Sequence, residues 1–205
     1  MTWVKICGIQ DADALDAAIA AGADAVGFVF ARESRRRIPP DQACELARRV
    51  HGAALRVGVF VEGSVADVEA LLDLVELDAL QWSGPEAPRG ASGTFGGMKQ
   101  IRSVHLAPGD PWPRRLPPAW AYLADAAAPG RHGGTGVRAD WQAAARGARR
   151  LPVILAGGLN LENVEQALDE VRPFGLDVSS GVERNGRKDP DLILSFVRAV
   201  RSHDA

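Results

Sequence analysis

Two reactive side chains stand where apolar runs of the sequence end. Cys7 closes the run WVKIC, and Asp125 follows the run WAYLA at residues 120–124. A thiolate is a candidate base or nucleophile, and a carboxyl group is a candidate acid. Lys5 lies two residues before Cys7 and on the same face of a strand, where its charge would favour the thiolate. Taken alone, Cys7 could be a buried hydrophobe and Asp125 a loop residue.

Glycine clusters follow three successive apolar runs in the second half of the chain: GGTG at 133–136, AGGL at 156–159 and SSGV at 179–182. Bare backbone N–H groups brought together in this way cradle a phosphate group without a lysine. Asp177 lies in the last run on the same face as Ser179, so its charge needs a partner, and a ribose hydroxyl is one candidate. The sequence therefore predicts a sugar phosphate as ligand.

A run of arginines, residues 35–37, follows the second apolar run. Such a run is usually a solvated loop, but at the edge of a sheet one guanidinium could hold a carboxylate with two hydrogen bonds. The four histidines are scattered, and no spacing typical of metal ligands occurs, so we expect no metal.

Eight short apolar runs alternate with helical or Gly/Pro-rich segments, as in a parallel sheet, and eight strands close a (β/α)8 TIM barrel. Cys7 ends the first predicted strand and Asp125 directly follows the sixth, so they should face each other across the mouth of the barrel. Helices are predicted to start after Asp11, Ser64 and Asn160. The predicted strands are 3–7, 25–30, 55–60, 79–82, 97–101, 120–124, 152–155 and 176–179, and the closing helix is 190–200.

Two connections, residues 84–96 and 103–118, hold many Gly and Pro residues, so the helices after the fourth and fifth strands should be truncated or irregular. No linker divides the chain, and we predict one domain over residues 1–205. A doubly wound open sheet is the alternative fold, but it would carry GxGxxG in the first turn, which here reads CGIQD at 7–11.

The amino-acid composition and net charge exclude several classes of function. The 205 residues include 24 Lys and Arg against 26 Asp and Glu, a net charge of −2, so neither nucleic acid nor an anionic membrane is an expected partner. Two cysteines cannot form a disulfide framework, and neither a signal peptide nor an apolar run of about 20 residues is evident. We expect a cytoplasmic protein with a small-molecule ligand.

The order of these motifs resembles the phosphoribosylanthranilate isomerases of tryptophan biosynthesis over nearly the whole chain. KICG near the start together with DVSSGVE near the end is the most specific part of the resemblance. The segments that carry it are VKICGI (4–9), GADAVGFVF (22–30), SRRRIPPDQA (34–43), VGVFV (57–61), LDALQWSG (77–84), Asp125 with GGTG, LAGGLNLENV (155–164) and DVSSGVERNGRKD (177–189).

The resemblance implies a (β/α)8 barrel that performs an Amadori rearrangement, an aldose–ketose isomerisation, without cofactor or metal. It implies that Cys7 is the general base, Asp125 the general acid and Arg36 the residue at the anthranilate carboxylate. Asp177 would lie at the ribose hydroxyls. The residues that match the phosphate loops are Gly157, Gly158, Ser180 and Gly181.

Three positions depart from the family pattern: Ser83 replaces a His, Arg35 replaces a Pro, and Asn185–Gly186 replaces ProGly. These changes leave the implied acid, base and phosphate loops in place. The sugar-phosphate isomerase of histidine biosynthesis is a rival, but it resembles a duplicated half-barrel with an Asp where this chain has Cys7. A barrel that only binds a phosphorylated ligand is another. The sequence leaves open a monomer or a homodimer.

Overall fold

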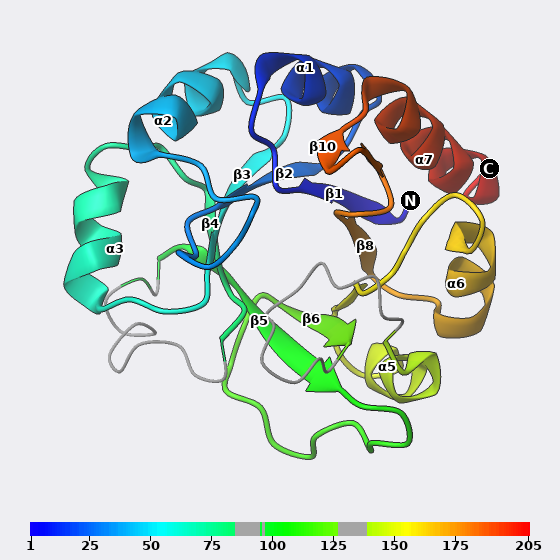
Figure 1. Ribbon diagram of the computed structural model, residues 1–205. Coiled ribbons are helices and arrows are strands. Elements are labelled where there is room, and N and C mark those ends of the chain that lie inside the picture. The colour runs from blue at the N-terminus through cyan, green and yellow to red at the C-terminus, as the bar shows by residue number, and fades with distance from the viewer. Residues whose placement is uncertain (85–94, 96, 127–138) are drawn as a thin grey trace.

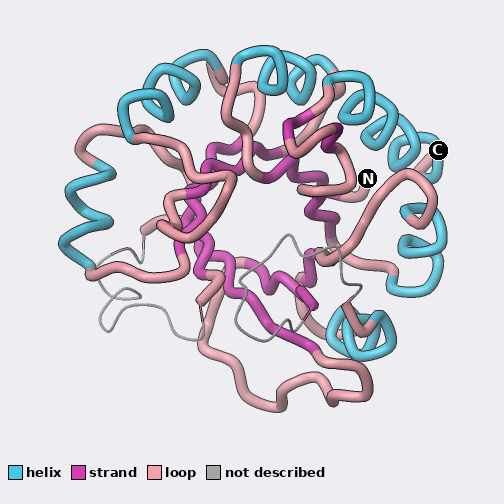
Figure 2. Tube along the Cα trace, in the orientation of Figure 1, coloured by secondary structure: helices cyan, strands magenta, loops and turns pink. Residues whose placement is uncertain are grey.

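Eight parallel strands close into a barrel in the computed structural model, which describes residues 1–84, 95, 97–126 and 139–205 (Figure 1). β1 pairs with both β2 and β8, which completes the circle seen in Figure 2. The predicted (β/α)8 barrel is therefore confirmed. The strands are β1 Trp3–Cys7, β2 Ala25–Val29, β3 Leu55–Phe60, β4 Ala79–Trp82, β5 Lys99–Leu106, β6 Ala121–Ala126, β7 Val153–Leu155 and β8 Gly175–Val178.

The fifth strand differs from its prediction. It was expected over 97–101 but extends to Leu106, because Val104 and Leu106 alternate as buried residues and the strand pairs with β6 over six positions. Residues 107–120, between β5 and β6, form turns and contain no helix. Most of the connection after β4 lies outside the described residues, so its irregular helix stays a prediction.

Helices cover the outside of the barrel (Figure 1). Asp11 caps the first by accepting a hydrogen bond from Ala14 N, and Ser64, the predicted start of the third, forms a capping box with Asp67. None of the helices in the described ranges is long and apolar enough to cross a membrane. The helices are α1 Ala12–Ala20, α2 Pro40–Arg49, α3 Val65–Leu72, α5 Trp141–Ala148, α6 Val164–Val171 and α7 Pro190–His203.

The start of α6 was predicted wrongly. Asn160 and Asn163 each accept a hydrogen bond from the other's backbone N–H, at 3.2 and 2.9 Å, but this pair closes a turn and the helix begins at Val164. The reciprocal bonding of a capping box is therefore present one turn before the helix itself.

A short hairpin after β8 was not predicted. It consists of β9 Glu183–Arg184 and β10 Arg187–Lys188, joined by Asn185 and Gly186 with φ of +53° and +78°. Two successive positive φ angles are what a type I′ hairpin turn requires, and Asn-Gly is its preferred pair. A proline, fixed near −65°, could not occupy the place of Asn185. The departure from ProGly thus has a local structural reason.

Two apolar layers hold the barrel. Alternate residues of each strand point outward to the helices, as Val4 and Ile6 do, or inward, as Cys7 does. The inward layer begins with Ala25, Ala79 and Ala121, the first residues of β2, β4 and β6, at the amino-terminal end of the barrel. The carboxyl ends of the strands form the opposite end, where barrels of this type carry their sites.

Candidate active site

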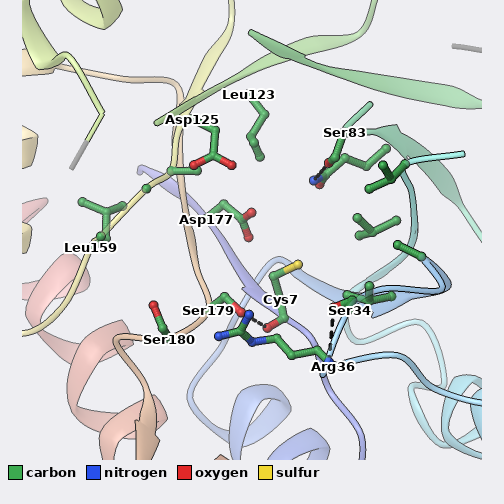
Figure 3. Close-up of a pocket in the computed structure, with 18 residues that line it drawn as sticks. Cys7, Ser34, Arg36, Ser83, Leu123, Asp125, Leu159, Asp177, Ser179 and Ser180 are labelled. Atoms are coloured by element: carbon green, nitrogen blue, oxygen red, sulfur yellow. Dashed lines mark hydrogen bonds between the residues drawn. The ribbon is translucent and has the colours of Figure 1, made fainter. Parts of the chain in front are cut away.

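A cavity opens at the carboxyl ends of the strands and holds about 700 Å³ of space, including open solvent at its mouth. Strands β1, β6 and β8 and the loops after β2, β7 and β8 all contribute to it. Figure 3 shows the Cys7 sulfur and the carboxyl groups of Asp125 and Asp177 pointing into the same space. The predicted site residues that line the cavity are Cys7, Arg36, Asp125, Gly157, Gly158, Asp177 and Ser180.

Lys5 lies beneath this cavity and is fully buried. Its Nζ lies 2.7 Å from Asp177 Oδ1, because β1 and β8 pair with Lys5 opposite Asp177. Burial alone would lower the pKa of Lys5, but the negative charges of Asp177 and of an ionised Cys7 raise it, so the ammonium form is favoured. The charge partner of Asp177 within the chain is therefore a lysine, whereas its contact with a ribose hydroxyl stays a prediction.

Cys7 is 8% exposed. Burial raises the pKa of the thiol, and the lowering by Lys5 does not compensate, since Asp177 also raises it. Lys5 thus favours the thiolate, as predicted, but burial outweighs its effect and the net pKa of Cys7 is raised. Gly27 on β2 makes room for the sulfur: a Cβ there would lie 2.9 Å from Cys7 Sγ. The signal for Gly27 was a glycine within the apolar run AVGFV.

Asp125 is also 8% exposed. Burial raises the pKa of its carboxyl group, although Ala126 N donates a 2.8 Å hydrogen bond to it and the charge of His105 acts in the opposite direction. A carboxyl group with a raised pKa remains protonated at higher pH than usual, as a general acid must. His105 lies opposite Asp125 in the pairing of β5 with β6, and sequence reasoning missed it.

Ser83, where the family motif has a His, lies close to this imidazole. His105 Nε2 lies 3.1 Å from the carbonyl oxygen of Ser83, and the Ser83 hydroxyl accepts a 2.8 Å hydrogen bond from Gln81 Nε2. An imidazole from the neighbouring strand therefore lies beside the position that the motif assigns to a histidine.

The loops after β7 and β8 come together as a backbone surface. Gly157 and Gly158 have φ of +80° and +68°, which favour glycine, and Asn160 forms an isolated bridge with Gly181. A Cβ at Gly181 would lie 1.8 Å from Leu159 O, so only glycine fits. The cluster at 133–136 lies outside the described residues.

Arg36 reaches the cavity from the loop after β2 and is paired with Glu183, its Nε lying 2.5 Å from Glu183 Oε1. Sequence reasoning missed Glu183 and Lys188, although both stand in the quoted segment at 177–189. In the described part of the chain, no three His, Cys, Asp or Glu residues are placed to hold a metal ion. The expected independence from metals and cofactors stays a prediction.

Comparisons with known proteins agree on one family. A sequence profile described as "N-(5'phosphoribosyl)anthranilate (PRA) isomerase" matches residues 4–199. An N-(5'-phosphoribosyl)anthranilate isomerase of Desulforudis audaxviator is 44% identical over 209 residues, covering 98% of each chain. The phosphoribosyl anthranilate isomerase structure from Thermus thermophilus has a TM-score of 0.85 and 35% identity, covering 98% of this chain and 99% of its own.

One further solved structure is a complex with a ligand. It is a phosphoribosyl anthranilate isomerase in complex with reduced 1-(o-carboxyphenylamino)-1-deoxyribulose 5-phosphate. Its TM-score is 0.81 at 31% identity, with coverage of 98% of this chain and all of that one.

Proposed function

The chain belongs to the family of N-(5'-phosphoribosyl)anthranilate isomerases, and we propose that Cys7 and Asp125 are the general base and general acid of its reaction. That reaction is the Amadori rearrangement of N-(5-phosphoribosyl)anthranilate to 1-(2-carboxyphenylamino)-1-deoxyribulose 5-phosphate, a step of tryptophan biosynthesis. One observation carries the assignment: both side chains, from β1 and β6 of the barrel, point into one cavity (Figure 3).

The substrate has a charged group at each end, and the cavity offers a suitable surface for each. Gly157, Gly158, Ser180 and Gly181 would surround the phosphate with backbone N–H groups. Arg36 would bind the carboxylate of the anthranilate ring from the other side. With both ends held, the ribose lies between acid and base, which reduces the entropic part of the barrier.

The first step needs a proton donor. Asp125 protonates the furanose ring oxygen, the bond from that oxygen to C1′ breaks, and the nitrogen lone pair forms a Schiff base. The raised pKa of Asp125, caused by burial, keeps a fraction of this carboxyl group protonated for the step.

The second step needs a base. Cys7, as thiolate, takes the proton from C2′, the electron pair forms the enolamine, and tautomerisation gives the ketone. The buried ammonium of Lys5 lies beside the sulfur and would stabilise the thiolate that the step requires, against the raising of the Cys7 pKa by burial. Lys5 also neutralises Asp177, which would otherwise repel a thiolate.

The test is the loss of fluorescence of freshly generated phosphoribosylanthranilate on addition of the protein. We expect turnover with the substrate and tight binding of a non-reacting product analogue. Binding of the analogue without any turnover would contradict the isomerase assignment and would favour a barrel that only binds a phosphorylated ligand.

Replacing Gly181 by Ala should lower kcat/KM by about 10²-fold. A methyl group at this position would lie 1.8 Å from Leu159 O, so the phosphate loop must move by an ångström or more, a displacement of the size that costs two orders of magnitude in rate. Steady-state kinetics measures the effect. Gly97→Ala is the matched control, because nothing lies within 4 Å of its added Cβ. Equal kcat/KM values for both variants would refute the assigned loop.

We also propose the cell compartment and partners from the same arguments. The partner is the small-molecule substrate, no nucleic acid takes part, and the protein acts in the cytoplasm, as expected for biosynthesis of an amino acid. A monomer or a homodimer remains the prediction for its assembly.

A further inference from the structure

Glu183 accepts hydrogen bonds from three cations of two different segments. Its Oε1 lies 2.5 Å from Arg36 Nε and 2.7 Å from Lys188 Nζ. Its Oε2 lies 2.7 Å from Arg35 Nη2 and 3.1 Å from Arg36 Nη2. One carboxylate in the β9–β10 hairpin thus holds the loop after β2, which lies far away in sequence.

The inner part of this group is shielded from water. The side chains of Glu183, Arg36 and Lys188 are 5%, 8% and 2% exposed. Burial alone would raise the pKa of Glu183, but the hydrogen bonds and charges of Arg36 and Lys188 lower it, so Glu183 is ionised. Charge-assisted bonds in such surroundings fix geometry more firmly than exposed ion pairs do.

The pairing uses only one edge of the Arg36 guanidinium. A guanidinium has five N–H donors, and Glu183 occupies the edge formed by Nε and Nη2. The edge formed by Nη1 and Nη2 carries a second parallel pair of donors. Because Arg36 lines the cavity, this second edge can receive another carboxylate with two hydrogen bonds.

Lys188 connects this pair to the backbone of Cys7 through Ser179. Its Nζ donates to Ser179 O at 3.0 Å, and Ser179 Oγ donates to Cys7 O at 2.9 Å (Figure 3 shows the second bond). The Arg36 guanidinium and the backbone of Cys7 therefore belong to one hydrogen-bonded set. This set positions the group that would bind the substrate carboxylate relative to the residue that would take the C2′ proton.

We propose that Glu183 is a positioning residue that orients Arg36, so that the free guanidinium edge selects substrates with a carboxylate on the aromatic ring. This inference rests on the proposed function. Lys188 donates a hydrogen bond to Glu183 on the buried side, and Arg35 forms a further ion pair with it on the exposed side. Arg35 Nη1 lies 3.5 Å from the Cβ position of Gly186, so two departures from the family pattern meet here.

The experiment compares Glu183→Gln with the wild type on two substrates, phosphoribosylanthranilate and phosphoribosylaniline, which lacks the carboxylate. Glu183→Gln should raise KM for the first substrate by about 10- to 100-fold, the range expected for losing hydrogen bonds to a charged group, with kcat changed less than about threefold. For phosphoribosylaniline, KM should be equal in both proteins. A general disturbance of the fold would raise KM for both substrates.

Two other variants complete the design. Glu183→Asp keeps the charge and should restore part of the affinity, and it serves if Glu183→Gln fails to fold. Arg184→Ala removes an exposed cation of the same hairpin, paired with Asp189 at 3.2 Å, and should leave both KM values unchanged. If the wild type turns over phosphoribosylanthranilate but Glu183→Gln keeps its KM, the inference is overturned. If the wild type shows no turnover, the proposed function itself fails.

Discussion

Asn in place of Asp125, or Ala in place of Cys7, should each lower kcat by about 10²- to 10⁴-fold, the usual contribution of a general acid or base. The amide of Asn cannot protonate the ring oxygen, and Ala cannot take the C2′ proton. Neither side chain binds the ends of the substrate, so the Kd of a product analogue should change by less than about threefold. Turnover and analogue titration measure the two quantities.

Cys44→Ala is the matched control for the thiol. Cys44 lies half-buried on α2, outside the cavity, and its replacement should leave kcat unchanged. Wild-type turnover in either Cys7→Ala or Asp125→Asn would remove that residue from the mechanism. A large loss of analogue affinity together with the loss of kcat would instead indicate that the cavity itself had changed.

Met in place of Lys5 should reduce the free energy of unfolding by about 3–5 kcal/mol, the range for removing one partner of a buried ion pair. Lys5 is fully buried and its Nζ lies 2.7 Å from Asp177 Oδ1, so the variant leaves a buried carboxylate without its cation. Urea unfolding at pH 7 measures the loss. The double variant Lys5→Met with Asp177→Asn should recover much of it, because no buried charge remains.

The loss in Lys5→Met should depend on pH with a definite sign. Without Lys5, the pKa of Asp177 in the folded protein rises further above its unfolded value. The protonated carboxyl group is tolerated, so the penalty is small below the unfolded pKa and grows as pH rises through the folded pKa. A loss that is independent of pH, or no recovery in the double variant, would contradict the role assigned to this pair.

The barrel was predictable because its signals are local and repeated. The apolar runs alternate with helices whose caps, at Asp11 and Ser64, are readable from a few residues. Strand β5 was misjudged because its second half, SVHL, runs directly into a Gly/Pro-rich connection, and only pairing with β6 extends it. The location of the cavity was predictable from reactive residues at the strand ends, because a closed barrel brings the carboxyl ends of all its strands to the same side.

Interactions between distant segments were not predictable from local patterns. No residue near Arg36 in the sequence indicates that Glu183 forms an ion pair with it. The contact depends on how the β9–β10 hairpin folds back. The acidity of Cys7 is a second case. The sequence places Lys5 on the same face, but the degree of burial and the charge of Asp177 decide the direction of the pKa change.

The pH dependence of the residual turnover in Asp125→Asn and Cys7→Ala tests the acid–base assignment most directly. Asp125→Asn retains only the base, so its residual kcat should rise with pH towards the raised pKa of Cys7. Cys7→Ala retains only the acid, so its residual kcat should fall as pH rises through the raised pKa of Asp125. Opposite slopes are the predicted result. Parallel profiles, or slopes in the reverse order, would contradict the assignment of Cys7 as base and Asp125 as acid.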